Sequence, residues 1–134
     1  MVKLIPGKRG SGKTKLLIEK ILAAKASSNG NVVAIQVGNS LNSEINHGVR
    51  LINIEDYRIV DCGAMYGFTC GIMASDYDCT HIFIDGILKI VGRDMDEIAK
   101  MLDTINKISD KSTEVTLTFS ADVNEIPENI KKYL

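Results

Sequence analysis

The sequence predicts an α/β fold, a three-layer α/β/α arrangement around a mostly parallel five-stranded sheet. Three observations favour it. Short runs rich in β-branched residues alternate along the chain with segments of helical periodicity. The runs are nearly continuously apolar, as expected of parallel strands covered on both faces. The 134 residues contain no linker, repeat or low-complexity tract, so we expect one domain over residues 1–134 with a single core.

The first half of the chain predicts three strands and one helix. Val2 to Ile5 is a short apolar strand, and Lys13 to Ser28 has apolar residues near helical spacing. Asn31 to Val37 is an almost unbroken apolar run between turn residues, which indicates a central strand. Gly38 to Gly48 is polar and predicts a loop. Val49 to Ile54 alternates more in polarity and suits an edge strand.

The segment from Asp61 to Ser75 predicts a helix with an unusual composition. Asp61 is a suitable N-cap residue, and Gly63, Gly67 and Gly71 recur at four-residue spacing. Each glycine in a helix costs about 1 kcal/mol relative to alanine. We therefore expect either that the glycine stripe has a packing role or that the segment is not helical throughout, and we favour close packing within the chain over a partner helix.

The second half of the chain predicts two further strands and two further helices. Thr80 to Ile84 is a strong apolar strand that ends in Asp85 and Gly86. Asp94 and Glu97 form a capping pair for a helix with apolar residues on one face. Glu114 to Phe119 predicts the last strand, and a short helix is expected after Pro127.

The loop after the first strand carries the most specific pattern. Residues 7–14 read GKRGSGKT, which matches the phosphate-binding pattern G-x-x-x-x-G-K-[ST] between a strand and a helix. Glycines let the backbone turn tightly and approach an anion, and the helix N-terminus adds its positive dipole end. We predict that this segment binds the phosphates of a nucleotide, with seven residues involved: Gly7, Gly10, Ser11, Gly12, Lys13, Thr14 and Lys15.

A metal site is predicted from two residues. The Thr14 hydroxyl is suited to bind Mg²⁺ in a loop of this kind. Asp85 ends a strand of apolar residues, Ile82 to Ile84, which is where such proteins place the carboxylate that holds a magnesium-bound water. The expected cofactors are therefore ATP, or another nucleoside triphosphate, and Mg²⁺.

Composition narrows the class of partner. The formal net charge is −1, so the chain has no clear nucleic-acid footprint. No apolar run approaches the roughly 20 residues needed to span a membrane, and no leader sequence is evident, so we expect a cytoplasmic protein without membrane contact. Cys62, Cys70 and Cys79 are odd in number and lack metal-site spacing, which favours reduced core thiols. A protein partner or a homo-oligomer remains open.

The two motifs resemble those of the P-loop nucleoside triphosphatase superfamily, and a further strand after Asp85 is similar to its RecA-like branch. The whole chain also resembles short bacterial ATP-binding proteins, some of them labelled twitching-motility ATPases. The resemblance implies a nucleotide fold, with Lys13 and Thr14 at phosphate and metal, Asp85 in the metal shell and Ser120 as a polar sensor. It does not imply a pilus motor, which carries much more chain.

One departure from that family concerns the residue that would activate water. Many RecA-like hydrolases have a glutamate directly after the metal acid, and here that residue is Gly86. Three other acids, Glu44, Glu55 and Asp61, are candidates for a base, although solvated surface carboxylates are the favoured interpretation. The sequence points to no built-in arginine finger among Arg9, Arg50, Arg58 and Arg93.

Three functions follow, in order of preference. The first is a Mg-ATP-binding switch or slow ATPase in which Mg-ATP orders the loop from Gly38 to Gly48. The second is a nucleoside or small-molecule kinase, since the layout is similar to that of thymidine kinases, although their adjacent glutamate, longer lid and zinc-binding cysteines are lacking. The third is a non-catalytic adaptor that keeps the fold. No guanine-selective N-K-x-D motif is present, which favours ATP over GTP.

Overall fold

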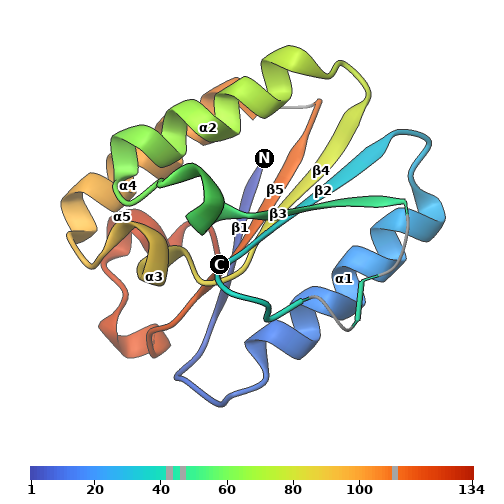
Figure 1. The fold of residues 1–134 in the computed structure, drawn as a ribbon. Helices are drawn as coiled ribbons and strands as arrows, with labels where there is room; N and C mark the ends of the chain where they lie inside the picture. The colour runs from blue at the N-terminus through green and yellow to red at the C-terminus, as the bar shows by residue number, and fades with distance from the viewer. Residues whose placement is uncertain (42–43, 46–47, 110–111) are drawn as a thin grey trace.

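The computed structural model describes residues 1–41, 44–45, 48–109 and 112–134, and it shows an α/β fold (Figure 1). The three-layer fold class predicted from the sequence is confirmed. The strands are β1 (Val2–Pro6), β2 (Asn31–Gln36), β3 (Val49–Asn53), β4 (Cys79–Ile84) and β5 (Glu114–Phe119). The helices are α1 (Lys13–Ser27), α2 (Cys62–Ser75), α3 (Ile87–Val91), α4 (Met95–Ser109) and α5 (Glu128–Lys131), with 3₁₀ turns at Ile54–Tyr57 and Val123–Glu125.

All five strands are parallel, in the order β1-β5-β4-β2-β3. β3 lies at an edge, as its alternating pattern predicted. The last strand, β5, lies between β1 and β4, with Pro6 opposite Phe119 and Ile84 opposite Leu117. The carboxyl ends of β1, β5 and β4 are therefore neighbours at one end of the sheet, where open α/β sheets bind ligands.

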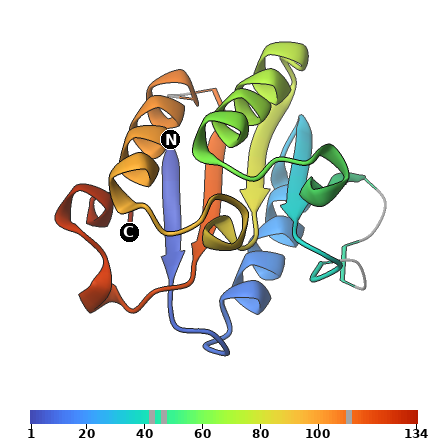
Figure 2. The same ribbon diagram turned by 60° about the vertical axis from the view of Figure 1, so that its left-hand side comes forward.

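Helices cover both faces of the sheet (Figures 1 and 2). α1 lies alone on one face, where Leu17 and Ile21 are fully buried among residues of β1, β2 and β4. α2 and α4 cover the other face, and the predicted apolar face of α4 is buried there, with Ile98, Leu102 and Ile105 fully inaccessible to solvent. The sheet is thus held rigidly from both sides, which fixes the positions of the strand ends.

The prediction that the glycine stripe of α2 packs within the chain is wrong. α2 is helical throughout, but Gly63, Gly67 and Gly71 are exposed. A Cβ added at Gly67 or Gly71 would meet no described atom within 4 Å, and one at Gly63 would touch only Asp61 Oδ1, at 3.6 Å. The side of α2 that packs inward is instead the one with the buried residues Met65 and Thr69.

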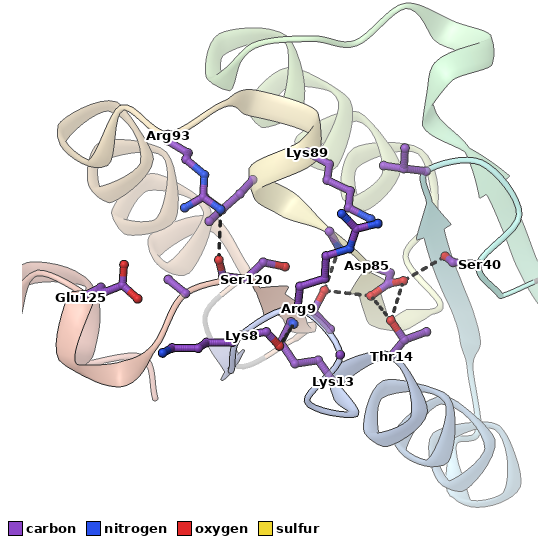
Figure 3. A pocket seen from close by; sticks show the side chains of 16 residues that line it. Lys8, Arg9, Lys13, Thr14, Ser40, Asp85, Lys89, Arg93, Ser120 and Glu125 are labelled. Atoms are coloured by element: carbon purple, nitrogen blue, oxygen red, sulfur yellow. Dashed lines mark hydrogen bonds between the residues drawn. The ribbon is translucent and has the colours of Figure 1, made fainter.

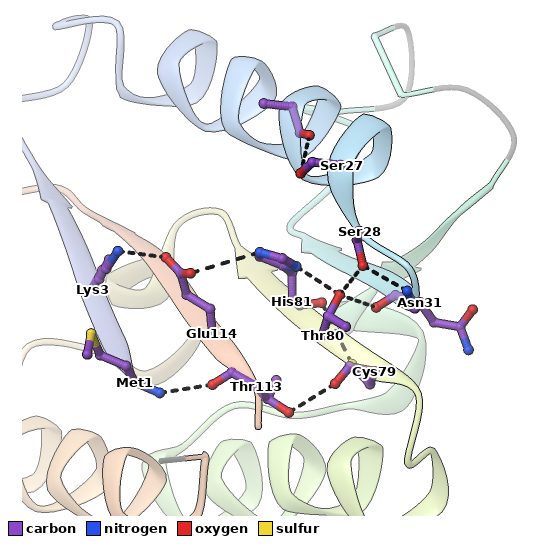
Figure 4. A network of polar contacts seen from close by, with 12 residues as sticks. Met1, Lys3, Ser27, Ser28, Asn31, Cys79, Thr80, His81, Thr113 and Glu114 are labelled. Atoms are coloured by element: carbon purple, nitrogen blue, oxygen red, sulfur yellow. Dashed lines mark hydrogen bonds and ion pairs between the residues drawn. The ribbon is translucent and has the colours of Figure 1, made fainter. Parts of the chain in front are cut away.

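A polar network crosses the sheet toward the amino ends of its strands, away from the loop of residues 7–14 (Figure 4). The Glu114 carboxylate accepts a hydrogen bond from the Lys3 ammonium group at 2.9 Å, and this ion pair lowers the pKa of Glu114. His81 lies 3.9 Å from the same carboxylate and contacts Thr80 at 2.9 Å. These partners tie β1, β5 and β4 together, so we assign them a structural role.

The other sequence predictions concern membrane spans, the cysteines and one loop. Of the cysteines predicted to be core thiols, Cys79 is buried, whereas Cys62 and Cys70 are only partly buried. No described helix is long and apolar enough to cross a membrane. Cys62, Cys70 and Cys79 are free thiols, and burial is the main cause that raises the pKa of Cys62 and Cys79. The predicted loop from Gly38 to Gly48 lies partly outside the described residues, at positions 42–43 and 46–47.

Candidate functional site

A cavity of about 480 Å³ lies at the carboxyl ends of β1, β4 and β5 (Figure 3). The loop between β1 and α1 forms one side of it, and the segment from Gly86 to Arg93 forms the opposite side. Five basic side chains line the cavity against two acidic ones, although the chain as a whole has a net charge of −1. Positive charge is therefore concentrated at this site: the basic residues are Lys8, Arg9, Lys13, Lys89 and Arg93, and the acidic ones are Asp85 and Glu125.

The loop has the backbone geometry that its glycines permit. Gly7 has φ +149°, and a Cβ there would overlap the Ser11 hydroxyl, so only glycine fits. Gly12 has φ +91° and is the N-cap of α1, with no side-chain cap. The first N–H groups of an α-helix have no partner within the helix, so those of α1 are available to an anion at this end. Of the seven predicted residues, Gly10, Lys13 and Thr14 line the cavity. The other four are not among its lining residues: Gly7, Ser11, Gly12 and the exposed Lys15.

Lys13 lies across the loop and donates a hydrogen bond from Nζ to the Lys8 carbonyl oxygen, at 3.0 Å. Its pKa is lowered, chiefly because partial burial disfavours the charged ammonium. Asp85 opposes this shift, whereas the nearby Lys89 ammonium adds to it. An anion bound between Lys13 and Lys89 would offset the cost of burying the Lys13 ammonium group and the repulsion between the two ammonium groups.

Asp85 is only 7% exposed and accepts hydrogen bonds from three hydroxyl groups. Thr118 donates to Oδ1 at 2.8 Å, and Ser40 donates to Oδ2 at 2.9 Å. Thr14 contacts both oxygens at 3.2 and 3.3 Å, which is longer than the usual O–H···O distance. Thr118 also accepts the Gly86 N–H at 2.7 Å, so both of its hydrogen-bonding functions orient the end of β4.

These groups suit a magnesium ion that takes most of its ligands from elsewhere. Asp85 is a buried carboxylate, and among the described residues no lysine or arginine forms an ion pair with it. A buried charge without a counter-ion is costly. The described residues contain no cluster of three His, Cys, Asp or Glu side chains for a protein-only metal site. Mg²⁺ commonly binds through one or two carboxylates, with phosphates and water completing its shell, and Asp85 with Thr14 fits that pattern.

The predicted sensor, Ser120, follows β5 and lines the cavity. Its backbone carbonyl accepts a hydrogen bond from Arg93 at 3.2 Å, which links the end of β5 to the segment after α3. Gly86 has φ +83° and is the N-cap of α3. That left-handed conformation is unfavourable for a glutamate, so the departure at position 86 has a backbone cause.

None of the three candidate bases lies in the cavity. Glu55 accepts the Gly38 N–H at 2.7 Å and holds the end of β2 against the turn after β3. Asp61 caps α2 by accepting the Ala64 N–H at 2.8 Å. Glu44 is exposed and is not among the lining residues. Apart from Asp85, Glu125 is the acid among the described lining residues, and it belongs to a capping box with Asp122.

Seven polar or charged lining residues were not predicted as site residues from the sequence: Lys8, Arg9, Ser40, Lys89, Arg93, Thr118 and Glu125. Thr118 lies near the carboxyl end of β5, but only the pairing of β5 with β4 brings it to Asp85. Lys89 and Arg93 follow Asp85 by four and eight residues, but only the short helix α3 brings them over the cavity. Ser40 could not be predicted from the sequence, because its contact with Asp85 depends on the path of a loop.

In comparisons with known proteins, no family model matches this chain and no curated protein matches it.

Proposed function

We propose that this chain binds Mg-ATP and acts as a nucleotide-dependent switch or slow ATPase. One observation carries the proposal: an uncapped helix N-terminus, Lys13 and the buried Asp85 converge on one basic cavity. Backbone N–H groups and a lysine bind phosphate, and the Thr14 hydroxyl with Asp85 would hold Mg²⁺. The metal would neutralise phosphate charge there. The cytoplasm, where ATP is abundant and thiols stay reduced, is the expected compartment.

The switch has a candidate moving part in the segment that begins at Gly38. Ser40 is exposed but donates to Asp85, and the fully buried Leu41 anchors the segment through its N–H to the Gln36 side chain at 2.8 Å. A ligand that changes the surroundings of Asp85 would therefore act directly on Ser40. Loops ordered by the terminal phosphate and its metal are a common switching device.

Binding is tested by thermal unfolding with Mg-ATP, Mg-ADP, Mg-GTP and nucleosides. A ligand that binds only the folded protein stabilises it by about 2.7 kcal/mol at one hundred times its dissociation constant. We expect a clear shift with Mg-ATP that Lys13→Ala largely removes. Lys20→Ala, an exposed lysine further along α1, is the matched control and should keep the full shift. An equal shift in Lys13→Ala would contradict the phosphate-loop assignment, and no shift with any nucleotide would favour the adaptor.

The kinase alternative has one observation in its favour. A second cavity of about 340 Å³ adjoins the first and shares Val37 and Lys89 with it. Apolar side chains line it together with Glu55 and Arg58, so it could hold a small polar acceptor. A nucleoside that accelerates ADP formation by the wild-type protein would favour this function over the switch.

A further inference from the structure

We propose that Lys89 and Arg93 form a second cationic arm that binds the terminal phosphate, so that the site distinguishes a nucleoside triphosphate from the diphosphate. The inference rests on the proposed nucleotide function and deepens it. Both residues come from the segment directly after Asp85, and Figure 3 shows them on the opposite side of the cavity from Lys8 and Lys13.

Two of the five basic side chains at the cavity, Lys89 and Arg93, lie outside the loop of residues 7–14. Lys13 and the N–H groups of the loop already provide the usual phosphate site. Lys89 lines the same cavity as Lys13, from the opposite side. Among the described residues, the two acids that line the cavity are Asp85, whose carboxylate accepts hydrogen bonds from Thr118 and Ser40, and Glu125, which belongs to a capping box. Five basic side chains against two acidic ones favour an anion of high charge between the two sides of the cavity.

The contacts of the two arm residues within the described chain leave most of their hydrogen-bonding groups available. Lys89 is exposed, and no ion pair or hydrogen bond of its side chain is found among the described residues. Arg93 is also exposed. Among the described residues, its guanidinium donates a hydrogen bond only to the Ser120 carbonyl, which leaves other N–H groups available. The Arg93 contact holds the guanidinium at the cavity rather than in solvent. Arg93 is thus held at the cavity that contains Asp85, and the Lys89 side chain lines the same cavity.

This geometry assigns both cations to the phosphate furthest from the loop. The Gly7–Thr14 side would take the inner phosphates through backbone N–H groups, so the outermost group would face α3 and the end of β5. A cation at that position compensates the charge of the terminal phosphate, which the diphosphate lacks. A nucleotide switch needs different affinities for the triphosphate and the diphosphate, and this arm would supply that difference.

The test compares Mg-ATP and Mg-ADP affinity, measured by titration calorimetry, in wild type and in the double variant Lys89→Gln with Arg93→Gln. Each charge-assisted hydrogen bond is worth enough to change affinity by about tenfold. We expect Mg-ATP affinity to fall by about tenfold or more, while Mg-ADP affinity changes by less than about threefold. The paired control is Lys107→Gln with Arg50→Gln, which removes the same two charges from exposed positions outside the cavity and should leave both affinities unchanged.

The outcomes separate this inference from the proposed function. Equal losses of Mg-ATP and Mg-ADP affinity, or no loss of either, would overturn the terminal-phosphate arm while leaving nucleotide binding intact. Failure of the wild-type protein to bind either nucleotide would overturn both proposals. Because both residues are exposed, the variants should fold, and thermal unfolding without ligand verifies this.

Discussion

At the scale of single residues, Asp85 shows how a buried charge is kept in place without a basic partner in the described chain. Thr118 and Ser40 each give one of its oxygens a hydrogen bond of normal length, while Thr14 approaches both oxygens at longer range. Hydroxyl donors stabilise the carboxylate but do not cancel its charge. The carboxylate is thus oriented and still able to attract a divalent cation.

Replacement of Asp85 by Asn tests that role. The amide keeps an oxygen that can accept the Thr118 hydrogen bond but loses the negative charge. We expect Mg-ATP affinity to fall by about tenfold or more, since charge-assisted contacts are worth about 1.5 to 3 kcal/mol, with a smaller effect on ADP binding in the absence of metal. Asp96→Asn, at an exposed position in the first turn of α4, is the control. Equal losses for both ligands would make Asp85 a structural residue.

At the scale of secondary-structure elements, nearly every helix and strand could be predicted, because each has its own periodicity. The predicted strand at Glu114 to Phe119 matches β5 at both ends, and the predicted helix that begins at Lys13 matches α1. The 5-residue helix α3 escaped prediction because a single turn carries no periodicity, and it depends on the left-handed Gly86 for its start. That omission is why Lys89 and Arg93 were not placed at the site.

The exposed glycines of α2 lead to a prediction about stability. Gly67 lies in a regular helix with open space where a Cβ would be, so Gly67→Ala should raise the free energy of unfolding by about 0.5 to 1 kcal/mol. Gly86→Ala is the matched contrast, because a side chain is unfavourable at φ +83°. This change should lower the free energy of unfolding by about 1 to 2 kcal/mol. Urea unfolding measures both changes.

A destabilising Gly67→Ala change would contradict this account of α2. It would mean that the glycine surface is covered in solution, and sedimentation of the wild-type protein would then show an assembly larger than the monomer. A stabilising effect together with a monomer would mean that the stripe is free surface.

At the scale of the whole molecule, the order of the strands is what the sequence could not supply. Local patterns identify five strands but do not say which of them pair, because pairing depends on contacts between residues far apart in the chain. The position of β5 between β1 and β4 brings Thr118 to Asp85 and Ser120 to the cavity. The loop motif and Asp85 could be predicted because they follow their strands directly, whereas Ser40, Lys89 and Arg93 depend on how loops cross the sheet edge.

The same arrangement limits how fast the isolated chain should hydrolyse ATP. The carboxylates that line the cavity in the described chain are Asp85, assigned to the metal, and Glu125, held in a capping box. Neither is free to activate water. Stabilisation of charge by Lys13 and the proposed arm of Lys89 and Arg93 does not require a base. Phosphoryl transfer to water in GTP-binding proteins proceeds at about 10⁻⁴ s⁻¹ without an arginine finger and about 10⁻² s⁻¹ with one in the same chain.

We therefore expect turnover between about 10⁻⁴ and 10⁻² s⁻¹. Nucleotide binding should be evident even though hydrolysis is slow. The measurement is release of inorganic phosphate from Mg-ATP by the purified protein, at several protein concentrations, with Lys13→Ala to subtract any contaminating activity. A rate that rises with protein concentration would indicate that a second copy supplies a missing group. Turnover of several per second by dilute protein, lost in Lys13→Ala, would contradict the slow-ATPase proposal, because it would require a complete catalytic site with a base outside those assigned.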